Sequence, residues 1–116
     1  MSPDDAVLVD IARAARNIVE FVASVDRQGF FADIRTQAAV QHQLLLIGEA
    51  AKRLTPAFRE ANPGVAWAEI AGMRDVLIHA YHRVDLGQVW AMSQRDVPAL
   101  LDFVTPLLPP PPDTRA

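Results

Sequence analysis

Apolar residues recur along the start of the chain at the spacing of one buried helical stripe. Ahead of them, Ser2 and Pro3 form a helix-start signature, and Asp4 and Asp5 place carboxylates at the positive end of the helix dipole. The pattern predicts a first helix that ends near residues 27–29. Its stripe consists of Val7, Leu8, Ile11, Ala14, Ala15, Ile18, Val22 and Val25.

The next segment predicts a helix over about residues 33–54, and its centre, LLLIGEAA at 44–51, is apolar on nearly every side. It follows a connector at Phe30 and Phe31, and Asp33 can cap its start. A helix that hides more than one face needs more than one neighbour, and small residues such as Gly48 let a neighbouring backbone approach closely. This helix is therefore predicted to be the spine of the fold.

Two further helices follow. Thr55 and Pro56 repeat the cap-plus-proline signature and predict a short helix to about residue 61, which the turn residues 62–64 end. A longer helix is predicted from Trp67 to His82, because apolar residues recur there at helical spacing.

The last helical stretch begins after Asp85, which can cap it. Pro98 removes one internal hydrogen bond, so a kink or break is expected at Val97. No convincing pair of strands is present in the pattern. The sequence predicts an all-α fold, an up-down bundle of four principal helices plus a short one over residues 1–108, with a mobile proline-rich tail at 109–116.

Composition narrows the class of protein. The chain has 116 residues, no cysteine and a formal net charge of −3, so it has no disulfide scaffold and no thiolate nucleophile, and it does not coat nucleic acid by bulk positive charge. The first residues show no targeting signal, and no apolar run is long enough for a membrane span. We expect a cytoplasmic protein without membrane association, and a chain this small often gains stability by self-association.

Residues 74–82 combine a cation, a carboxylate, two imidazoles and a phenol within one predicted helix. Arg74 and His79 lie about 140° apart around a regular helix, and His79 and Tyr81 about 160° apart. A single straight helix cannot aim all three at one small ligand. Either the helix ends or distorts near His79, or the site forms where two copies of the helix meet.

A two-fold dimer would suit the residue types. Two arginines and two histidines would supply fixed positive charge for a phosphate and imidazoles that exchange protons near neutral pH. These groups are sufficient for RNA cleavage without a metal, because that reaction needs a base for the ribose 2′-hydroxyl, an acid for the leaving oxygen and cations for the developing charge. Asp75 could orient a histidine or an arginine.

Ordinary structural roles remain open for the same residues. Arg74 and Asp75 could form a surface ion pair, and His79 and Tyr81 could be half-buried packing residues. His79 and His82 could share a metal, but no third ligand has a recognisable spacing, so no metal or other cofactor is predicted. His42 reads as an ordinary helix residue.

The segment RDVLIHAY at 74–81 has the pattern R-x4-H-x-Y, and its surroundings add specificity. Over about residues 4–104 the chain resembles HepT-like proteins, which are members of the HEPN superfamily of all-helical, dimerising RNases. The supporting segments are IGEAAKRL at 47–54, the Asn62-Pro63 turn before Trp67, GMRD at 72–75, and the pairs Val84-Asp85 and Val89-Trp90.

The resemblance implies the toxin of a type VII-like toxin–antitoxin system. Arg74 and His79 would form a metal-independent endoribonuclease site at a homodimer interface, with Asp75 assisting. A cognate nucleotidyltransferase of the MNT type would neutralise the toxin by adding AMP to Tyr81, which brings negative charge and bulk beside the cations. Assembly beyond a dimer is left open.

Lys52, Arg53 and Arg83 are candidates for contact with RNA phosphates. The alternative function is a non-catalytic helical subunit that binds and regulates a nucleotidyltransferase, and the negative net charge motivates it.

Overall fold

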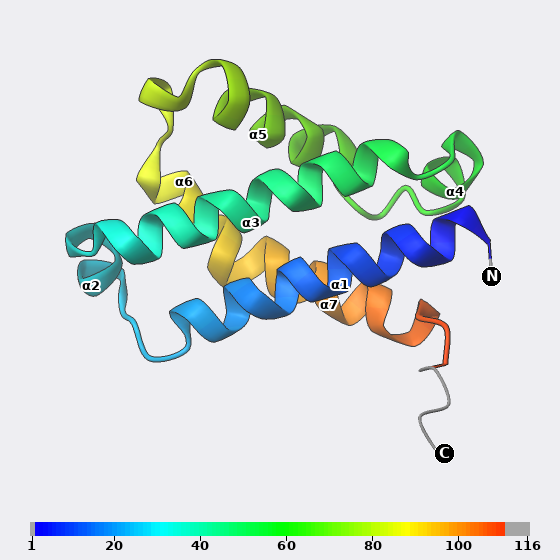
Figure 1. The fold of residues 1–116 in the computed structure, drawn as a ribbon, viewed down its shortest axis with the longest axis horizontal. Coiled ribbons are helices and arrows are strands. Elements are labelled where there is room, and N and C mark those ends of the chain that lie inside the picture. The colour runs from blue at the N-terminus through cyan, green and yellow to red at the C-terminus, as the bar shows by residue number, and fades with distance from the viewer. Residues whose placement is uncertain (1, 111–116) are drawn as a thin grey trace, which may run out of the picture.

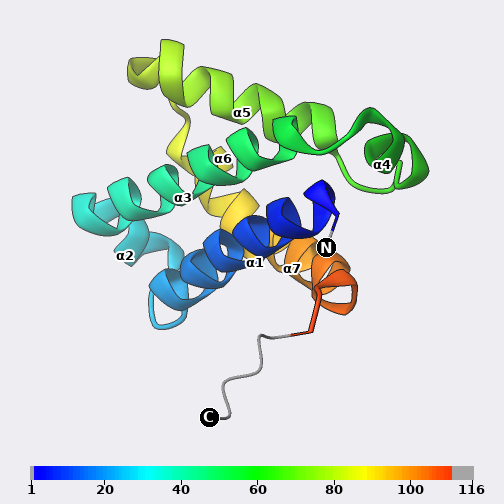
Figure 2. The same cartoon turned by 45° about the vertical axis from the view of Figure 1, so that its right-hand side comes forward.

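The helix α3, Ile34–Arg53, lies between two others and contacts both, as the sequence predicts for a spine. A computed structural model describes residues 2–110. The helix α1, Pro3–Val22, packs on one side of α3, and α5, Trp67–His79, packs on the other (Figures 1 and 2). The helix α7, Val97–Val104, covers α1 from the side away from α5.

The principal helices alternate in direction along the chain, so the up-down arrangement is confirmed (Figure 1). Residues 2–110 are helical throughout, apart from turns and connectors, and contain no strand. None of the helices in this part of the chain combines the length and apolar character needed to cross a bilayer. The tail predicted at 109–116 lies outside the described residues from position 111 onward.

The predicted caps form at the starts of several helices. Ser2 and Asp5 make a reciprocal capping box, in which the Asp5 backbone N–H donates to Ser2 Oγ and the Ser2 N–H donates to Asp5 Oδ2. Asp33 accepts hydrogen bonds from backbone N–H groups in the first turn of α3. Thr36 Oγ1 also donates a hydrogen bond to the Asp33 carboxylate, which lowers the pKa of Asp33. Thr55 caps α4, Pro56–Ala61, as expected.

The predicted end of the first helix is wrong. α1 ends at Val22, and a separate short helix, α2, Arg27–Ala32, occupies the expected connector. Asp26 caps α2 by accepting a hydrogen bond from the Gly29 backbone N–H at 2.7 Å. The break lets Phe30 become fully buried, 5.3 Å from the Trp90 ring centre.

The motif helix also ends earlier than predicted. α5 stops at His79, Ala80 leaves the helical conformation with φ −140° and ψ 42°, and Tyr81–Arg83 form a 3-10 turn, η1. The chain then brings Val84 and Leu86 against the core. The helix therefore ends near His79, as one of the two possibilities required, but this end changes the direction of Tyr81 only and leaves Arg74 and His79 on the same regular helix.

The fourth principal helix is divided. α6, Leu86–Ala91, is followed by a π-helical turn, η2, at Met92–Asp96, then by α7 and a short 3-10 turn, η3, at Thr105–Leu107. Asp85 caps α6 as predicted, through the Gly87 and Gln88 backbone N–H groups. A break is expected at Val97, but the helix becomes irregular five residues earlier, at Met92, because it widens into a π turn ahead of Pro98.

Candidate functional site

Arg74 lies in the middle of α5, on the side that packs against α3, and Gly48 lies opposite it. A Cβ atom at Gly48 would overlap the Arg74 Cβ, and would lie 2.9 Å from its Cγ and 3.2 Å from the Ile70 carbonyl oxygen. Only glycine, which lacks a Cβ, therefore permits α3 and α5 to cross this closely. The close crossing of the two helices therefore fixes the position of the Arg74 Cβ and Cγ atoms.

Carboxylates from both helices hold the Arg74 guanidinium. Its Nη1 donates a hydrogen bond to Asp75 Oδ1 at 3.0 Å, and its Nη2 lies 3.8 Å from Glu49 Oε1. The side chain is only 24% exposed, and its Nε is buried without a hydrogen-bond partner among residues 2–110. The guanidinium has five N–H donors, so the contact with Asp75 leaves donors for a phosphate.

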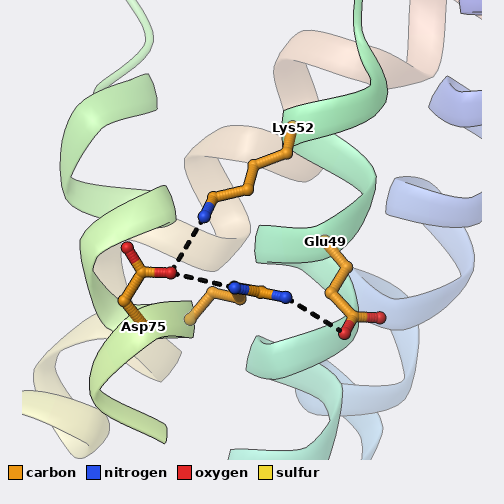
Figure 3. Close-up of polar contacts among 4 residues, drawn as sticks. Glu49, Lys52 and Asp75 are labelled. Atoms are coloured by element: carbon orange, nitrogen blue, oxygen red, sulfur yellow. Dashed lines mark hydrogen bonds and ion pairs between the residues drawn. The ribbon is translucent and has the colours of Figure 1, made fainter. Parts of the chain in front are cut away.

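Lys52 joins the same network from α3. Its Nζ donates to Asp75 Oδ1 at 2.9 Å, and Figure 3 shows Lys52 reaching across from α3 to Asp75, while Glu49 meets the guanidinium between the two helices. The hydrogen bonds from Lys52 and then Arg74 hold the pKa of Asp75 below its ordinary value. At neutral pH Asp75 is therefore an anion that orients two cations, and it has no proton to donate.

The charges of this network cancel within one chain. Arg74 and Lys52 contribute two positive charges, and Glu49 and Asp75 contribute two negative charges. The network orients its cations well but offers no excess positive charge to an RNA phosphate. Any excess positive charge at the site must therefore come from residues outside this network.

His79 lies apart from this network. It is the last residue of α5 and is exposed, and no hydrogen bond or ion pair joins it to Arg74 within the described residues. Since α5 is regular between the two residues, their offset of about 140° is retained. One chain alone does not bring Arg74 and His79 to a common point.

Tyr81 points away from the direction that a continued helix would give it, because the chain turns at Ala80. Its side chain is 62% exposed, and it lines a cavity against the first half of α3. His82 and Arg83 follow in η1 and are also exposed. Tyr81 is thus accessible, and it lies two residues after His79.

Two of the three residues predicted to contact RNA phosphates lie away from the Arg74 network. Lys52 is part of that network, whereas the neighbouring Arg53 extends to the other side of α3, where its Nη2 lies 3.1 Å from Asp10 on α1. Arg83 lies beyond the end of α5. Within residues 2–110, no group of three or more His, Asp or Glu side chains could hold a metal ion.

The close approach predicted at Gly48 is confirmed, but the sequence did not indicate that Arg74 is the neighbour, and it gave Glu49 no part in the site. A signal was present, since Glu49 and Lys52 are three residues apart and therefore share one face of a helix. Their contact with the motif depends on how α3 crosses α5, which no local pattern specifies.

The α3–α5 pair also exposes apolar side chains. Leu46 on α3 is 38% exposed, and Val76 and Ile78 on α5 are 37% and 40% exposed. α5 packs mainly on α3 and buries only Met73 and Leu77. The motif helix therefore carries apolar surface that its own chain does not cover.

A larger cavity, of about 540 Å³, lies at the other end of α5. Its lining is mostly apolar, and its charged side chains are the carboxylates Glu69 and Asp96. Two carboxylates would repel a phosphate polymer. This cavity is therefore not a candidate for contact with an RNA backbone.

Comparison with known proteins gives a consistent result. Residues 11–107 match the family described as ribonuclease HepT-like. A protein of Thermococcus cleftensis named "Probable ribonuclease HepT" is 42% identical over 93 residues, which is 80% of this chain and 84% of that protein. No solved structure matches the chain significantly.

Two further relatives carry ribonuclease names. A "Putative RNase" of Methanocaldococcus jannaschii is 36% identical over 95 residues, covering 82% of this chain and 87% of that protein. A "Putative RNase" of Caldanaerobacter subterraneus subsp. tengcongensis is 36% identical over 101 residues, covering 87% of this chain and 90% of that protein.

Proposed function

We propose that this chain, which belongs to the ribonuclease HepT-like family, is an endoribonuclease that cleaves RNA without a metal at a site shared by two copies. The observation that carries the proposal is the arrangement around Arg74. A buried, glycine-dependent helix crossing and two carboxylates fix one guanidinium, while an exposed histidine ends the same helix.

The groups suit transfer of a phosphate from one ribose oxygen to another. One His79 takes the proton of the ribose 2′-hydroxyl, whose oxygen attacks phosphorus, and the His79 of the second copy protonates the departing 5′-oxygen. The products are a 2′,3′-cyclic phosphate and a free 5′-hydroxyl. Arg74 stabilises the charge that develops on the phosphate oxygens, and Asp75, held as an anion, orients Arg74.

A dimer is supported by two features of the single chain. The apolar side chains Val76 and Ile78 on α5 are exposed, although a helix with this composition gains stability when both of its sides are covered. One chain also keeps Arg74 and His79 about 140° apart around α5. Two-fold pairing of α5 would cover the exposed apolar side chains and would bridge this offset.

We further propose that the chain is a toxin that a cognate nucleotidyltransferase of the MNT type neutralises at Tyr81. The Tyr81 hydroxyl oxygen would attack the α-phosphorus of ATP, with loss of its proton and departure of pyrophosphate. The 62% exposure of Tyr81 makes this oxygen accessible. The added phosphate would compete with RNA for the same cations.

The proposal is tested with purified protein and RNA in the presence of a chelator. Wild type should cleave RNA, Arg74→Ala and His79→Ala should each abolish cleavage, and all should keep their helical circular dichroism. His82→Ala is the matched control, because His82 is an exposed histidine close to His79 with no proposed role. Cleavage by His79→Ala at the wild-type rate would refute the proposal.

A second candidate is a non-catalytic subunit that binds and regulates a nucleotidyltransferase. The formal net charge of −3 and the charge balance of the Arg74 network favour it. It predicts that expression leaves growth unchanged. Growth arrest that requires both Arg74 and His79 would exclude this candidate.

A further inference from the structure

A small cavity lies beside the candidate active site, where the axes of α3 and α5 diverge (Figures 1 and 2). Its volume is about 210 Å³. Leu45, Leu77 and Ile78 supply apolar surface, and Gln41, His42 and Tyr81 supply the polar groups. Ile78 directly precedes His79 in the chain, so the cavity lies at the end of α5 that carries the proposed catalytic histidine.

Gln41 is the unusual member of this lining. It is only 6% exposed, and its side-chain amide makes no hydrogen bond within residues 2–110. Its amide atoms are not completely shielded from solvent, and they contact it through the cavity. The donor and acceptor groups of this amide are therefore open to the cavity and unused by the described residues.

Gln37, one helical turn earlier on α3, provides the comparison. It is 8% exposed, and its Nε2 donates to the carbonyl oxygens of Phe30 at 2.9 Å and Phe31 at 3.2 Å. Gln37 therefore has a structural role that its hydrogen bonds explain. Gln41 is similarly buried but has no such partner, so its hydrogen-bonding groups are available to a molecule that enters the cavity.

The chemistry of the cavity selects the kind of ligand. No lysine, arginine, aspartate or glutamate lines it, so it suits an uncharged group better than a phosphate. A primary amide presents a donor and an acceptor side by side, which is the pattern that pairs with the edge of adenine. An exposed tyrosine ring provides a surface on which a base can stack.

We propose that this cavity binds an adenine ring, with the Gln41 amide pairing with its edge and the Tyr81 ring stacking on its face. Drug-sized ligands occupy cavities of about 300–1,000 Å³, so the smaller cavity here matches a single flat ring system. His42, exposed at the mouth, is placed to contact the attached ribose.

The adenine could come from either of two sources, and this part of the inference rests on the proposed function. It could be an adenosine of the RNA next to the cleaved phosphate, which would give the enzyme a base preference. It could also be the AMP attached to Tyr81, which would hold the modified residue in a fixed position. Both sources require the same pairing with Gln41.

The direct test uses ¹⁵N-labelled protein and free nucleotides, with no cleavage involved. Adenosine monophosphate should shift the side-chain NH₂ signals of Gln41, whereas uridine monophosphate should not. Gln41→Leu should weaken adenosine monophosphate binding by about tenfold or more. Gln43→Leu is the control, because Gln43 is on the same helix but accepts a hydrogen bond from Asn17 on α1.

Stability gives an independent reading of the same variants. Gln41→Leu should unfold at a temperature at least as high as wild type, because the Gln41 side chain makes no hydrogen bond within residues 2–110 and leucine adds apolar contact beside Leu45 and Leu77. Equal shifts of the Gln41 signals with both nucleotides, or no shift with either, would overturn the proposal. Signals that move only when the protein is diluted would also overturn it, because the second copy would then fill the cavity.

Two further arms separate the sources. Two short RNAs that differ only in one adenosine or uridine beside the cleaved bond test the first source: wild type should prefer adenosine by about tenfold, and Gln41→Leu should cut both equally. AMP on Tyr81 should shift the Gln41 signals without added nucleotide if the second source applies. If wild type binds adenosine monophosphate but cuts no RNA, the proposed function fails and the adenine site stands.

Discussion

α1 and α5 both pack on α3, yet they use their apolar residues differently. α1 has 20 residues, eight of them buried, and a complete capping box at its start. α5 has 13 residues, two of them buried, and no side-chain cap. α1 therefore stabilises the fold of the single chain, whereas α5 leaves apolar and reactive side chains exposed, as the proposed dimer and RNA site require.

The largest expected effect separates the two helices by stability. Ile18→Ala on α1 should lower the free energy of unfolding by about 2–5 kcal/mol, because Ile18 is fully buried. Ile78→Ala on α5 should lower it by less than about 1 kcal/mol in the monomer, because Ile78 is 40% exposed. Urea unfolding at low protein concentration measures both.

The same α5 variant should weaken self-association. Sedimentation velocity over a range of concentrations should show a smaller dimer fraction for Ile78→Ala than for wild type. An equal loss of unfolding free energy in the two variants would contradict the proposed difference between α1 and α5.

The second prediction concerns the crossing that joins the two regions. Gly48→Ala should lower the free energy of unfolding by about 1–3 kcal/mol and displace Arg74, because the new Cβ overlaps that side chain. RNA cleavage should fall by about 100-fold, mainly in kcat, since small displacements of a catalytic group have effects of that size.

Gly72→Ala provides the matched control on α5, because a Cβ at Gly72 meets nothing within 4 Å. It should raise the free energy of unfolding by about 0.5–1 kcal/mol, owing to the better helix propensity of alanine, and leave cleavage unchanged. If Gly48→Ala keeps full activity, Arg74 does not depend on the helix crossing.

These residues also indicate how far the sequence alone could lead. The starts of α1, α3, α4 and α6 were predictable because caps and prolines act within a single turn. The end of α5 was not, because no glycine or proline stands between 79 and 85. The helix stops there since Val84 and Leu86 must reach the core, which is a requirement of tertiary packing.

The candidate site divides in the same way. The motif residues Arg74, Asp75, His79 and Tyr81 were recognisable from their spacing along the chain. The contacts of Glu49 and Gly48 with Arg74, and the cavity at Gln41, arise only where α3 meets α5. The π turn at Met92–Asp96 likewise depends on packing, because it buries both Met92 and Ser93.

A smaller effect distinguishes two adjacent cations on α3. Lys52→Met should raise the KM for RNA and reduce the salt dependence of binding by about one phosphate contact, because Lys52 belongs to the Arg74 network. Arg53→Met should change neither, because Arg53 pairs with Asp10 on the other side of α3. Both should alter the free energy of unfolding by less than about 1 kcal/mol.

Filter-binding measurements at several salt concentrations would compare the two variants. Equal losses of affinity would show that the RNA surface extends across both sides of α3 and is not confined to the α3–α5 side.

The smallest effect is the pH dependence of the Asp75 contacts. The pKa of Asp75 is lowered in the folded chain, so its contacts stabilise the fold above its unfolded pKa of about 4 and are lost as the pH falls through the folded value. The unfolding free energies of wild type and Asp75→Asn should differ by a constant amount between about pH 5 and 7. They should converge below about pH 4, and a difference that grows with acidification would contradict this assignment.

The most direct test of a site shared between two copies uses mixed dimers. Wild type and His79→Ala are allowed to exchange subunits at equal concentration, and RNA cleavage is then measured with a chelator present. If each cleavage event needs the His79 of both copies, only the wild-type dimers are active, and about a quarter of the wild-type activity should remain. Retention of about half the activity would show that one His79 is sufficient for each cleavage event, and would contradict the proposed pair of histidines.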